Sequence, residues 1–197
     1  MSVANAISDT GYEAWLRYGR LPELEAGALA RWCGRIVMPE RDGLFGNVLR
    51  EITAALAPLA GVEPEVLDAP GGAADAADNP GAGRALVAAA AERAAAFGLL
   101  DEAEAERLHK EGFIIRTVRR DGFEAVLIAG GSARGLLYGA FHFLRLAAIG
   151  RLDDRALASL NIAEQPRNPL RMINHWDNMD GSIERGYAGK SIFYRNG

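Results

Sequence analysis

The side chains best suited to chemistry gather in residues 174–190 of the 197-residue chain. This segment combines carboxylates, amides, an indole and basic groups: Asn174, His175, Trp176, Asp177, Asn178, Asp180, Glu184, Arg185, Tyr187 and Lys190. A tryptophan face can cover the apolar C–H face of a pyranose ring, while polar groups hydrogen-bond the ring's hydroxyls. Arginine or lysine would also pair with a carboxylate on the ligand. The segment therefore indicates a site for a sugar.

Each of these side chains also has a simpler interpretation, and the sequence leaves both open. Trp176 could fill the core where a strand meets its loop, because tryptophan buries a large apolar area. Asp177 and Asp180 could cap turns through their own backbone, which is the commoner role of aspartate before glycine. Glu184 and Arg185 could form a solvated pair that contributes little to stability.

Metal and nucleotide sites find little support in the sequence. Asp177, Asp180 and Gly181 faintly resemble a calcium loop, but the spacing is wrong. Where Asp180 and Gly181 fit that motif, its first ligand position falls on Trp176. A single histidine, His175, is a poor basis for a metal site, and the sequence contains no P-loop or dinucleotide-binding glycine motif. We therefore reject a calcium site.

The elements before this segment must position its side chains. Residues 170–176 begin as an apolar strand and turn polar and aromatic, and barrel enzymes carry functional groups at the C-terminal ends of such strands. Just upstream, Pro166 and Pro169 lie in a polar stretch that suits a domain boundary. We therefore expect one domain over residues 1–165 and the start of a second over residues 166–197.

The clearest signal in the first domain is a β-hairpin. Residues 113–118 and 123–129 are rich in β-branched and aromatic side chains. Between them, Asp121-Gly122 supplies the positive φ angles that a tight turn requires. The pattern predicts two antiparallel strands joined at this dipeptide.

A helix is predicted directly after the hairpin. Ser132 can cap its start and Gly150 its end. Gly135 and Gly139 would let this helix approach the sheet closely. The face predicted to pack on the core carries Leu137, Phe141, Leu144 and Ala148.

Weaker patterns complete the first domain. Gly61 can end a helix over residues 47–59, and Asp101 with Glu104 can begin one over residues 101–112. Residues 85–97 fit either a helix or a brief buried strand at Leu86 and Val87 followed by a helix. Strands are expected at 12–18, 62–67 and 157–162, and an exposed loop at 69–83. This order predicts an α/β domain, a sandwich-like α+β arrangement in which helices cover a small sheet.

Composition excludes several classes of partner. The net charge of −4 argues against nucleic-acid binding, and no apolar run approaches a membrane span. The lone Cys33 fits a reducing compartment, and the first 15 residues show no secretory signal pattern. We therefore expect a cytoplasmic protein that binds neither nucleic acid nor a membrane.

The stretch over residues 166–190, with Asn174-His-Trp-Asp-Asn178 at its centre, resembles the start of the catalytic barrel in α-glucuronidases of glycoside hydrolase family 67. Residues 12–18 and 135–145 are similar to the family's N-terminal domain. The predicted order of strands and helices is likewise similar to the accessory α/β domain that precedes the barrel in this family and in the β-hexosaminidases. The resemblance implies that residues 166–197 carry the first strand of a truncated (β/α)8 barrel.

The resemblance also implies an activity. Such enzymes hydrolyse the α-1,2 bond between (4-O-methyl-)glucuronic acid and the terminal xylose of xylo-oligosaccharides, with inversion. Inverting hydrolysis uses a carboxylic acid and a carboxylate base roughly 6.5–9.5 Å apart, and in this family both come from barrel strands beyond position 197. The positions here that match the family's motif are then expected to bind substrate: Trp176, Asp177, Asn178, Glu184 and Arg185.

Further expectations follow from the same resemblance. The ligands would be aldouronic acids, that is, glucuronoxylo-oligosaccharides, and neither a metal nor an organic cofactor is implied. The full-length enzyme could form a homodimer, and some family members are extracellular. Without the acid and base, the 197 residues alone are expected to be inactive. The alternative is a non-catalytic accessory or carbohydrate-binding module.

Overall fold

The structure is a computed structural model that describes residues 18–70, 83–120, 122–168, 170–172, 174, 176–183 and 191. It divides into two compact units, one up to Gln165 and one from Pro166 onward. The expected strand at 12–18 lies outside the described residues except for Tyr18, and most of the expected loop at 69–83 lies outside them as well.

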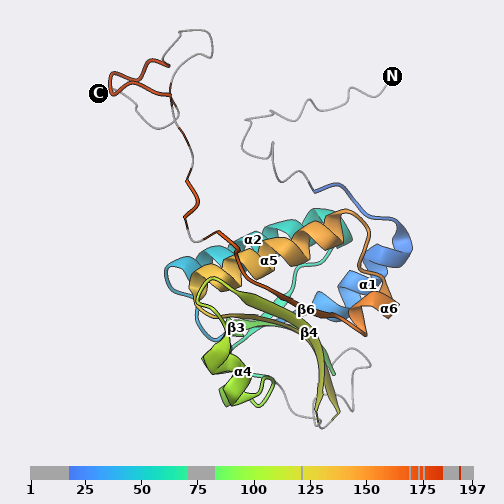
Figure 1. Cartoon of the computed structure of the whole chain (residues 1–197). Helices are drawn as coiled ribbons and strands as arrows, with labels where there is room; N and C mark the ends of the chain where they lie inside the picture. Colours follow the sequence, from blue (N-terminus) through green and yellow to red (C-terminus); the bar gives the residue numbers. More distant parts are fainter. Residues whose placement is uncertain are drawn as a thin grey trace, which may run out of the picture. The chain divides into compact units, whose positions relative to one another are not determined.

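Within the described residues, six strands form one mixed sheet in the first unit (Figure 1). The strands are β1 (Arg35–Val37), β2 (Glu65–Leu67), β3 (Arg84–Ala90), β4 (Phe113–Arg120), β5 (Phe123–Gly130) and β6 (Asn161–Glu164). Their order across the sheet is β2-β1-β3-β5-β4-β6. Strand β1 pairs in parallel with β2 and β3, and β3 pairs in parallel with β5. Strand β4 runs antiparallel to both β5 and β6. The sheet therefore combines parallel pairing with one hairpin and an antiparallel edge.

Helices cover both faces of this sheet (Figure 1). They are α1 (Glu23–Cys33), α2 (Leu44–Ala60), α3 (Ala91–Ala96), α4 (Glu102–Arg107), α5 (Ala133–Ala148) and α6 (Asp154–Leu157). One apolar layer lies between the sheet and α1, α2, α5 and α6, and the other lies against α3 and the segment that follows it. The predicted α/β class, a sheet covered by helices, is confirmed. No helix in the described ranges is both long and apolar enough to cross a membrane.

Strand β3 shows why residues 85–97 were ambiguous from sequence. Leu86 and Ala88 contribute to one apolar layer, while Ala85 and Val87 contribute to the other. A strand buried on both faces has no polar alternation, so periodicity cannot separate it from a buried helix. The second interpretation, a buried strand followed by a helix, is the correct one, and the strand is longer than expected.

The hairpin prediction is confirmed. Strands β4 and β5 pair from Phe113 opposite Gly130 to Arg120 opposite Phe123. Gly122 has a φ of 80°, a conformation that glycine adopts without the steric penalty of a side chain. Asp121 lies outside the described residues.

The helix after the hairpin is also confirmed at both ends. The Ser132 hydroxyl accepts hydrogen bonds from the backbone N–H groups of Arg134 and Gly135, which satisfies donors that the first turn leaves unpaired. A Cβ at Gly135 would lie 2.3 Å from the carbonyl oxygen of Gly112. The glycine therefore permits a close approach that alanine would prevent.

The predicted core face of α5 is wrong by one residue. Leu137 and Phe141 are half-buried at its flank and Ala148 is exposed, and only Leu144 was assigned correctly. The buried stripe consists of Gly135, Leu136, Gly139, Ala140, Phe143, Leu144 and Ala147. Apolar residues occupy both neighbouring stripes, so the period alone could not choose between them. The two glycines mark the correct face, because the helix lies closest to its neighbours there.

Several boundaries differ from the predictions. Helix α2 begins at Leu44 and not at residue 47, and Gly61 ends it with a φ of 69°, as predicted. Helix α4 ends at Arg107 and does not reach Gly112. The strand expected at 62–67 is shorter, at Glu65–Leu67. The strand expected at 157–162 lies at Asn161–Glu164, because the preceding residues form α6.

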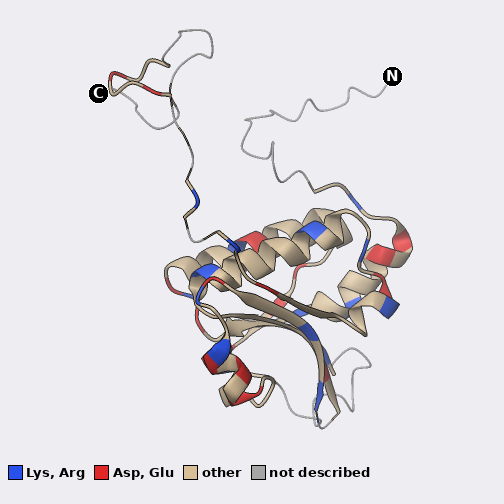
Figure 2. Ribbon diagram, in the orientation of Figure 1, with Lys and Arg blue, Asp and Glu red and all other residues tan. Residues whose placement is uncertain are grey.

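An ion pair between α4 and β4 is expected to make the stability of the fold depend on pH. Glu104 accepts two hydrogen bonds from the Arg116 guanidinium, at 2.8 and 2.7 Å. In Figure 2 acidic residues are coloured red on α4 and basic residues blue on β4. The hydrogen bond from Arg116 lowers the pKa of Glu104 below its ordinary value. The pair therefore stabilises the fold fully above the unfolded pKa of about 4.3, and this contribution is lost as the pH falls through the lower folded pKa.

Replacing Glu104 by glutamine is expected to lower the free energy of unfolding at neutral pH by about 0.5–1 kcal/mol, a modest value because both side chains are about one third exposed. The difference from wild type should shrink as the pH falls below the unfolded pKa of about 4.3 and through the lower folded pKa. Urea titrations at neutral pH and over a series of acidic pH values measure it. Glu106→Gln, on the exposed side of the same helix, is the matched control and should change little. A Glu104→Gln effect that persists in acid would contradict the assignment.

Candidate functional site

The candidate site lies in the second unit, where residues 177–183 form a tight hairpin. Asp177 and Ile183 form an isolated antiparallel bridge. The Gly181 N–H donates to the Asn178 carbonyl at 3.0 Å, and the Asn178 N–H donates to the Ser182 carbonyl at 2.8 Å. Gly181 has a φ of 82°, as expected for glycine in the bulge that follows a turn of this kind. The backbone of residues 177–183 is therefore locally folded.

Side chains inside the hairpin reinforce the turn. Asp180 Oδ1 accepts hydrogen bonds from the Ser182 N–H at 2.8 Å and from the Ser182 hydroxyl at 2.6 Å. Asn178 Nδ2 donates to Ser182 Oγ at 2.9 Å. The hydrogen bonds that Asp180 accepts from Ser182, chiefly the one from the hydroxyl, lower the pKa of Asp180. The simpler interpretation of Asp180 as a turn-capping residue is confirmed.

Asp177 is held by a residue that lies 14 positions later. Its Oδ2 accepts a hydrogen bond from Ser191 Oγ at 2.5 Å. The Ser191 N–H also donates to the Gly181 carbonyl at 3.0 Å. Ser191 thus contacts both the side chain at the start of the hairpin and the backbone of its turn.

Trp176 is half exposed, with 50% of its surface accessible. The interpretation of this tryptophan as a core residue is therefore wrong for the structure described. Met172 and Met179 are each 80% exposed, so apolar surface of this unit remains open to solvent.

The structure describes three of the five predicted site residues. Trp176, Asp177 and Asn178 lie at the start of the hairpin, whereas Glu184 and Arg185 lie outside the described residues. The predicted barrel strand is not confirmed, because residues 170–172 and 174 form no strand. A parallel barrel strand forms hydrogen bonds with strands on both sides, and the described residues contain no neighbouring barrel strand.

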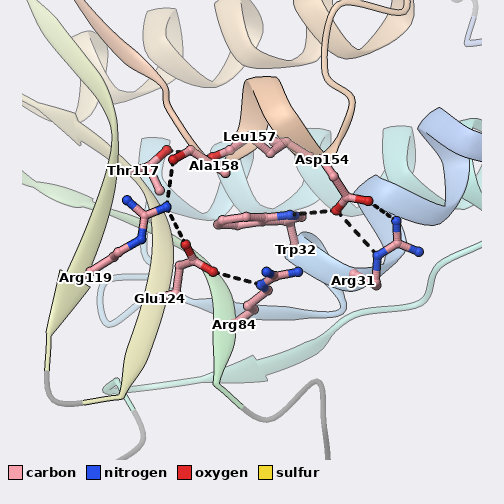
Figure 3. Close-up of polar contacts among 9 residues, drawn as sticks. All are labelled: Arg31, Trp32, Arg84, Thr117, Arg119, Glu124, Asp154, Leu157 and Ala158. Carbon is pink, nitrogen blue, oxygen red and sulfur yellow. Dashed lines mark hydrogen bonds and ion pairs between the residues drawn. The ribbon is translucent and has the colours of Figure 1, made fainter.

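A second cluster of charged side chains lies in the first unit, where α1 and α6 meet the sheet (Figure 3). Trp32 is fully buried, and its Nε1–H donates to Asp154 Oδ1 at 3.2 Å. Arg31 donates to both oxygens of the same carboxylate. These bonds, chiefly those from Arg31, lower the pKa of Asp154.

Glu124 is engaged in the same way at the other side of this cluster. Arg84 Nε donates to its Oε2 at 3.0 Å, and Arg119 Nη2 lies 2.6 Å from its Oε1 (Figure 3). The Arg84 guanidinium also lies 4.4 Å from the centre of the Trp32 ring. Both carboxylates of the cluster therefore bind arginines that hold elements together. Asp154, whose pKa is lowered, is poorly suited to donate a proton.

Metal and thiol chemistry gain no support from the described part of the chain. It contains no group of three His, Cys, Asp or Glu side chains placed to hold a metal ion. Cys33 is fully buried, and burial raises the pKa of its thiol to about 12, so the reactive thiolate is suppressed.

Two serines were not identified from the sequence: Ser182, which lies in the hairpin, and Ser191, which forms hydrogen bonds with the hairpin. Ser182 follows Asp180-Gly181, and an aspartate two residues before a serine is a signal for the local bond that forms here. Ser191 carries no such signal, because its partner Asp177 is distant in the sequence and their contact depends on the fold of the intervening chain.

Comparison with known proteins identifies the family of the chain. Residues 14–143 match the profile described as Glycosyl hydrolase family 67 N-terminus, and residues 152–197 match the family's middle domain. The chain belongs to glycosyl hydrolase family 67.

Named relatives support the same assignment. The chain is 30% identical to the alpha-glucuronidase of Hypocrea jecorina over 206 residues, an alignment that covers the whole chain and 22% of that protein. It is 47% identical over 83 residues to a probable alpha-glucuronidase A of Aspergillus fumigatus, which is 39% of this chain and 9% of that protein. The alpha-glucuronidase A of Aspergillus tubingensis is 45% identical over 83 residues. The chain thus spans about a fifth or less of the length of these relatives.

Proposed function

We propose that the chain is the N-terminal part of an inverting α-glucuronidase that removes α-1,2-linked (4-O-methyl-)glucuronic acid from xylo-oligosaccharides. The observation that carries this proposal is the match of most of the chain to the N-terminal and middle domains of one family, together with relatives named alpha-glucuronidase. The first unit is then the accessory domain, and residues from Pro166 onward begin the catalytic (β/α)8 barrel.

In this proposal the hairpin forms part of the sugar-binding surface. Trp176, which is half exposed, stacks on the apolar face of a pyranose. Asp177 accepts hydrogen bonds from the hydroxyls of the sugar, and Asn178 accepts hydrogen bonds from them and donates to them. Glu184 and Arg185 are assigned to the same surface from the resemblance of their motif. An arginine there would pair with the uronic acid carboxylate.

The catalytic acid and base are assigned to parts of the enzyme outside this chain. In the first unit Glu124 and Asp154 bind arginines, and in the second Asp177 and Asp180 accept hydrogen bonds from serines. Inversion requires one protonated carboxyl and one free carboxylate on opposite sides of the scissile bond. The engagement of these four carboxylates supports a binding role for this chain and leaves proton transfer to other residues.

A ligand titration of the 197-residue protein tests the sugar-binding role. Aldotetraouronic acid is expected to shift the Trp176 indole N–H signal in NMR spectra, whereas neutral xylotriose should not shift it comparably. The affinity should be weak, because we assign much of the barrel's binding surface to parts of the enzyme outside this chain. Trp176→Ala is expected to weaken binding about fivefold, or about 1 kcal/mol.

Met179→Ala is the matched control, because Met179 is an exposed apolar residue in the same hairpin. It should leave binding unchanged. Equal responses to the acidic and neutral sugars would contradict the proposed ligand class, and a Trp176→Ala protein that binds like wild type would contradict the role of the indole.

A further inference from the structure

We propose that Ser191 is a positioning residue that fixes the orientation of the Asp177 carboxylate toward a sugar ligand. The inference rests on the proposed function for the ligand, but the orienting role itself depends only on contacts within the second unit. Nothing in the motif around Trp176 assigns a role to this serine.

Burial distinguishes Ser191 from Ser182, the serine within the hairpin. Among the residues that the structure describes, Ser191 is the one polar side chain that is buried, with 4% of its surface exposed. Ser182, in contrast, is exposed. A hydroxyl shielded from water keeps its hydrogen-bond partner, because no solvent molecule can replace it. The bond from Ser191 is therefore the one expected to persist.

The two bonds from Ser191 have separate tasks. The backbone bond to the Gly181 carbonyl, at 3.0 Å, places residue 191 against the turn. The hydroxyl, fixed by that backbone, then donates to Asp177 Oδ2 at 2.5 Å. A carboxylate whose one oxygen is held in this way keeps a single side-chain rotamer and directs its second oxygen, which can accept a further hydrogen bond.

Orientation matters because a mobile carboxylate must lose rotamer freedom when it binds. Asp177 follows Trp176 directly, so the carboxylate and the indole are presented from the same end of the hairpin. Fixing the carboxylate before the ligand arrives reduces the entropy lost on binding. Ser191 would provide this preorganisation without contacting the sugar.

The role is testable without a ligand. In the 197-residue protein, three-bond NMR couplings across χ1 of Asp177 should report a single rotamer. Ser191→Ala is expected to give averaged couplings, while the residue 191 amide keeps its slow hydrogen exchange, because the backbone bond to Gly181 does not involve the hydroxyl. Ser182→Ala, the matched control, should leave the Asp177 couplings unchanged. Wild-type couplings that are already averaged would overturn the proposal.

Loss of slow exchange at residue 191 in the alanine variant would also overturn it, since the hydroxyl would then hold residue 191 against the turn and not the carboxylate alone. With aldotetraouronic acid, Ser191→Ala should weaken binding about threefold to tenfold. An unchanged affinity despite averaged couplings would overturn the positioning role. If wild type binds no aldotetraouronic acid, the proposed sugar site fails, whereas the Asp177 couplings still decide whether Ser191 orients the carboxylate.

Discussion

Replacing Phe143 by alanine is expected to lower the free energy of unfolding of the first unit by about 3–5 kcal/mol. Phe143 is fully buried on α5, in the apolar layer that this helix shares with the sheet and α2. Removing the ring loses its burial and leaves a cavity that surrounding helices and strands cannot fill without moving. Urea unfolding of the 197-residue protein, followed by circular dichroism, measures the change.

Phe141 provides the matched control, because it is the same residue type two positions away on the same helix. It is only half-buried at the flank of the core, so Phe141→Ala should cost roughly 1–2 kcal/mol. The contrast separates a core role from a general effect of losing a phenyl ring in α5. Equal losses for the two variants would show that the face of the helix has been assigned incorrectly.

Features of this fold that depend on neighbouring residues could be predicted from sequence. Gly122 and Gly61 lie at positions of positive φ, where the absence of a side chain decides the conformation. Ser132 and Asp101 accept hydrogen bonds from N–H groups two or three residues later. Each of these signals requires only a short stretch of chain, and each was confirmed.

Features that depend on distant partners could not be predicted in the same way. Strand β1 has three residues and is defined by pairing with β2 and β3, which lie about 30 and 50 positions later. Helix α1, also missed, carries a fully buried Trp32 whose partner, Asp154, comes from α6. In the candidate site, the Asp180–Ser182 bond is local and recognisable, whereas the Asp177–Ser191 bond depends on tertiary contact.

The boundary between the two units also differs from the boundary between the family's two profiles. The match to the middle domain begins at residue 152, yet α6 and β6 belong to the first unit, which extends to Gln165. The Thr117 hydroxyl on β4 donates to the Leu157 carbonyl at 2.6 Å and accepts from the Leu160 N–H at 3.0 Å. Residues that sequence comparison groups with the middle domain thus complete the sheet of the preceding one.

The 197-residue protein is expected to release no glucuronic acid from aldouronic acids above background. General acid–base catalysis typically contributes about 10²–10⁴-fold, and we assign both groups to parts of the enzyme outside this chain. An acid must remain protonated near neutral pH, which requires a raised pKa. Instead, hydrogen bonds from Arg31 lower the pKa of Asp154, and hydrogen bonds from Ser182 lower that of Asp180.

Measurement of glucuronic acid released from aldotetraouronic acid, beside the alpha-glucuronidase of Hypocrea jecorina as the positive control, tests this expectation. Adding the Asp177→Asn variant makes the test specific. If the chain shows a trace of activity and the variant abolishes it, Asp177 takes part in proton transfer and its assignment as a binding residue is wrong. Release near the rate of the full-length relative would show that the acid and base lie within these 197 residues. Equal background rates for wild type and variant are the expected result, because we assign Asp177, held by its hydrogen bond from Ser191, to accept a hydrogen bond from a sugar hydroxyl and not to transfer a proton.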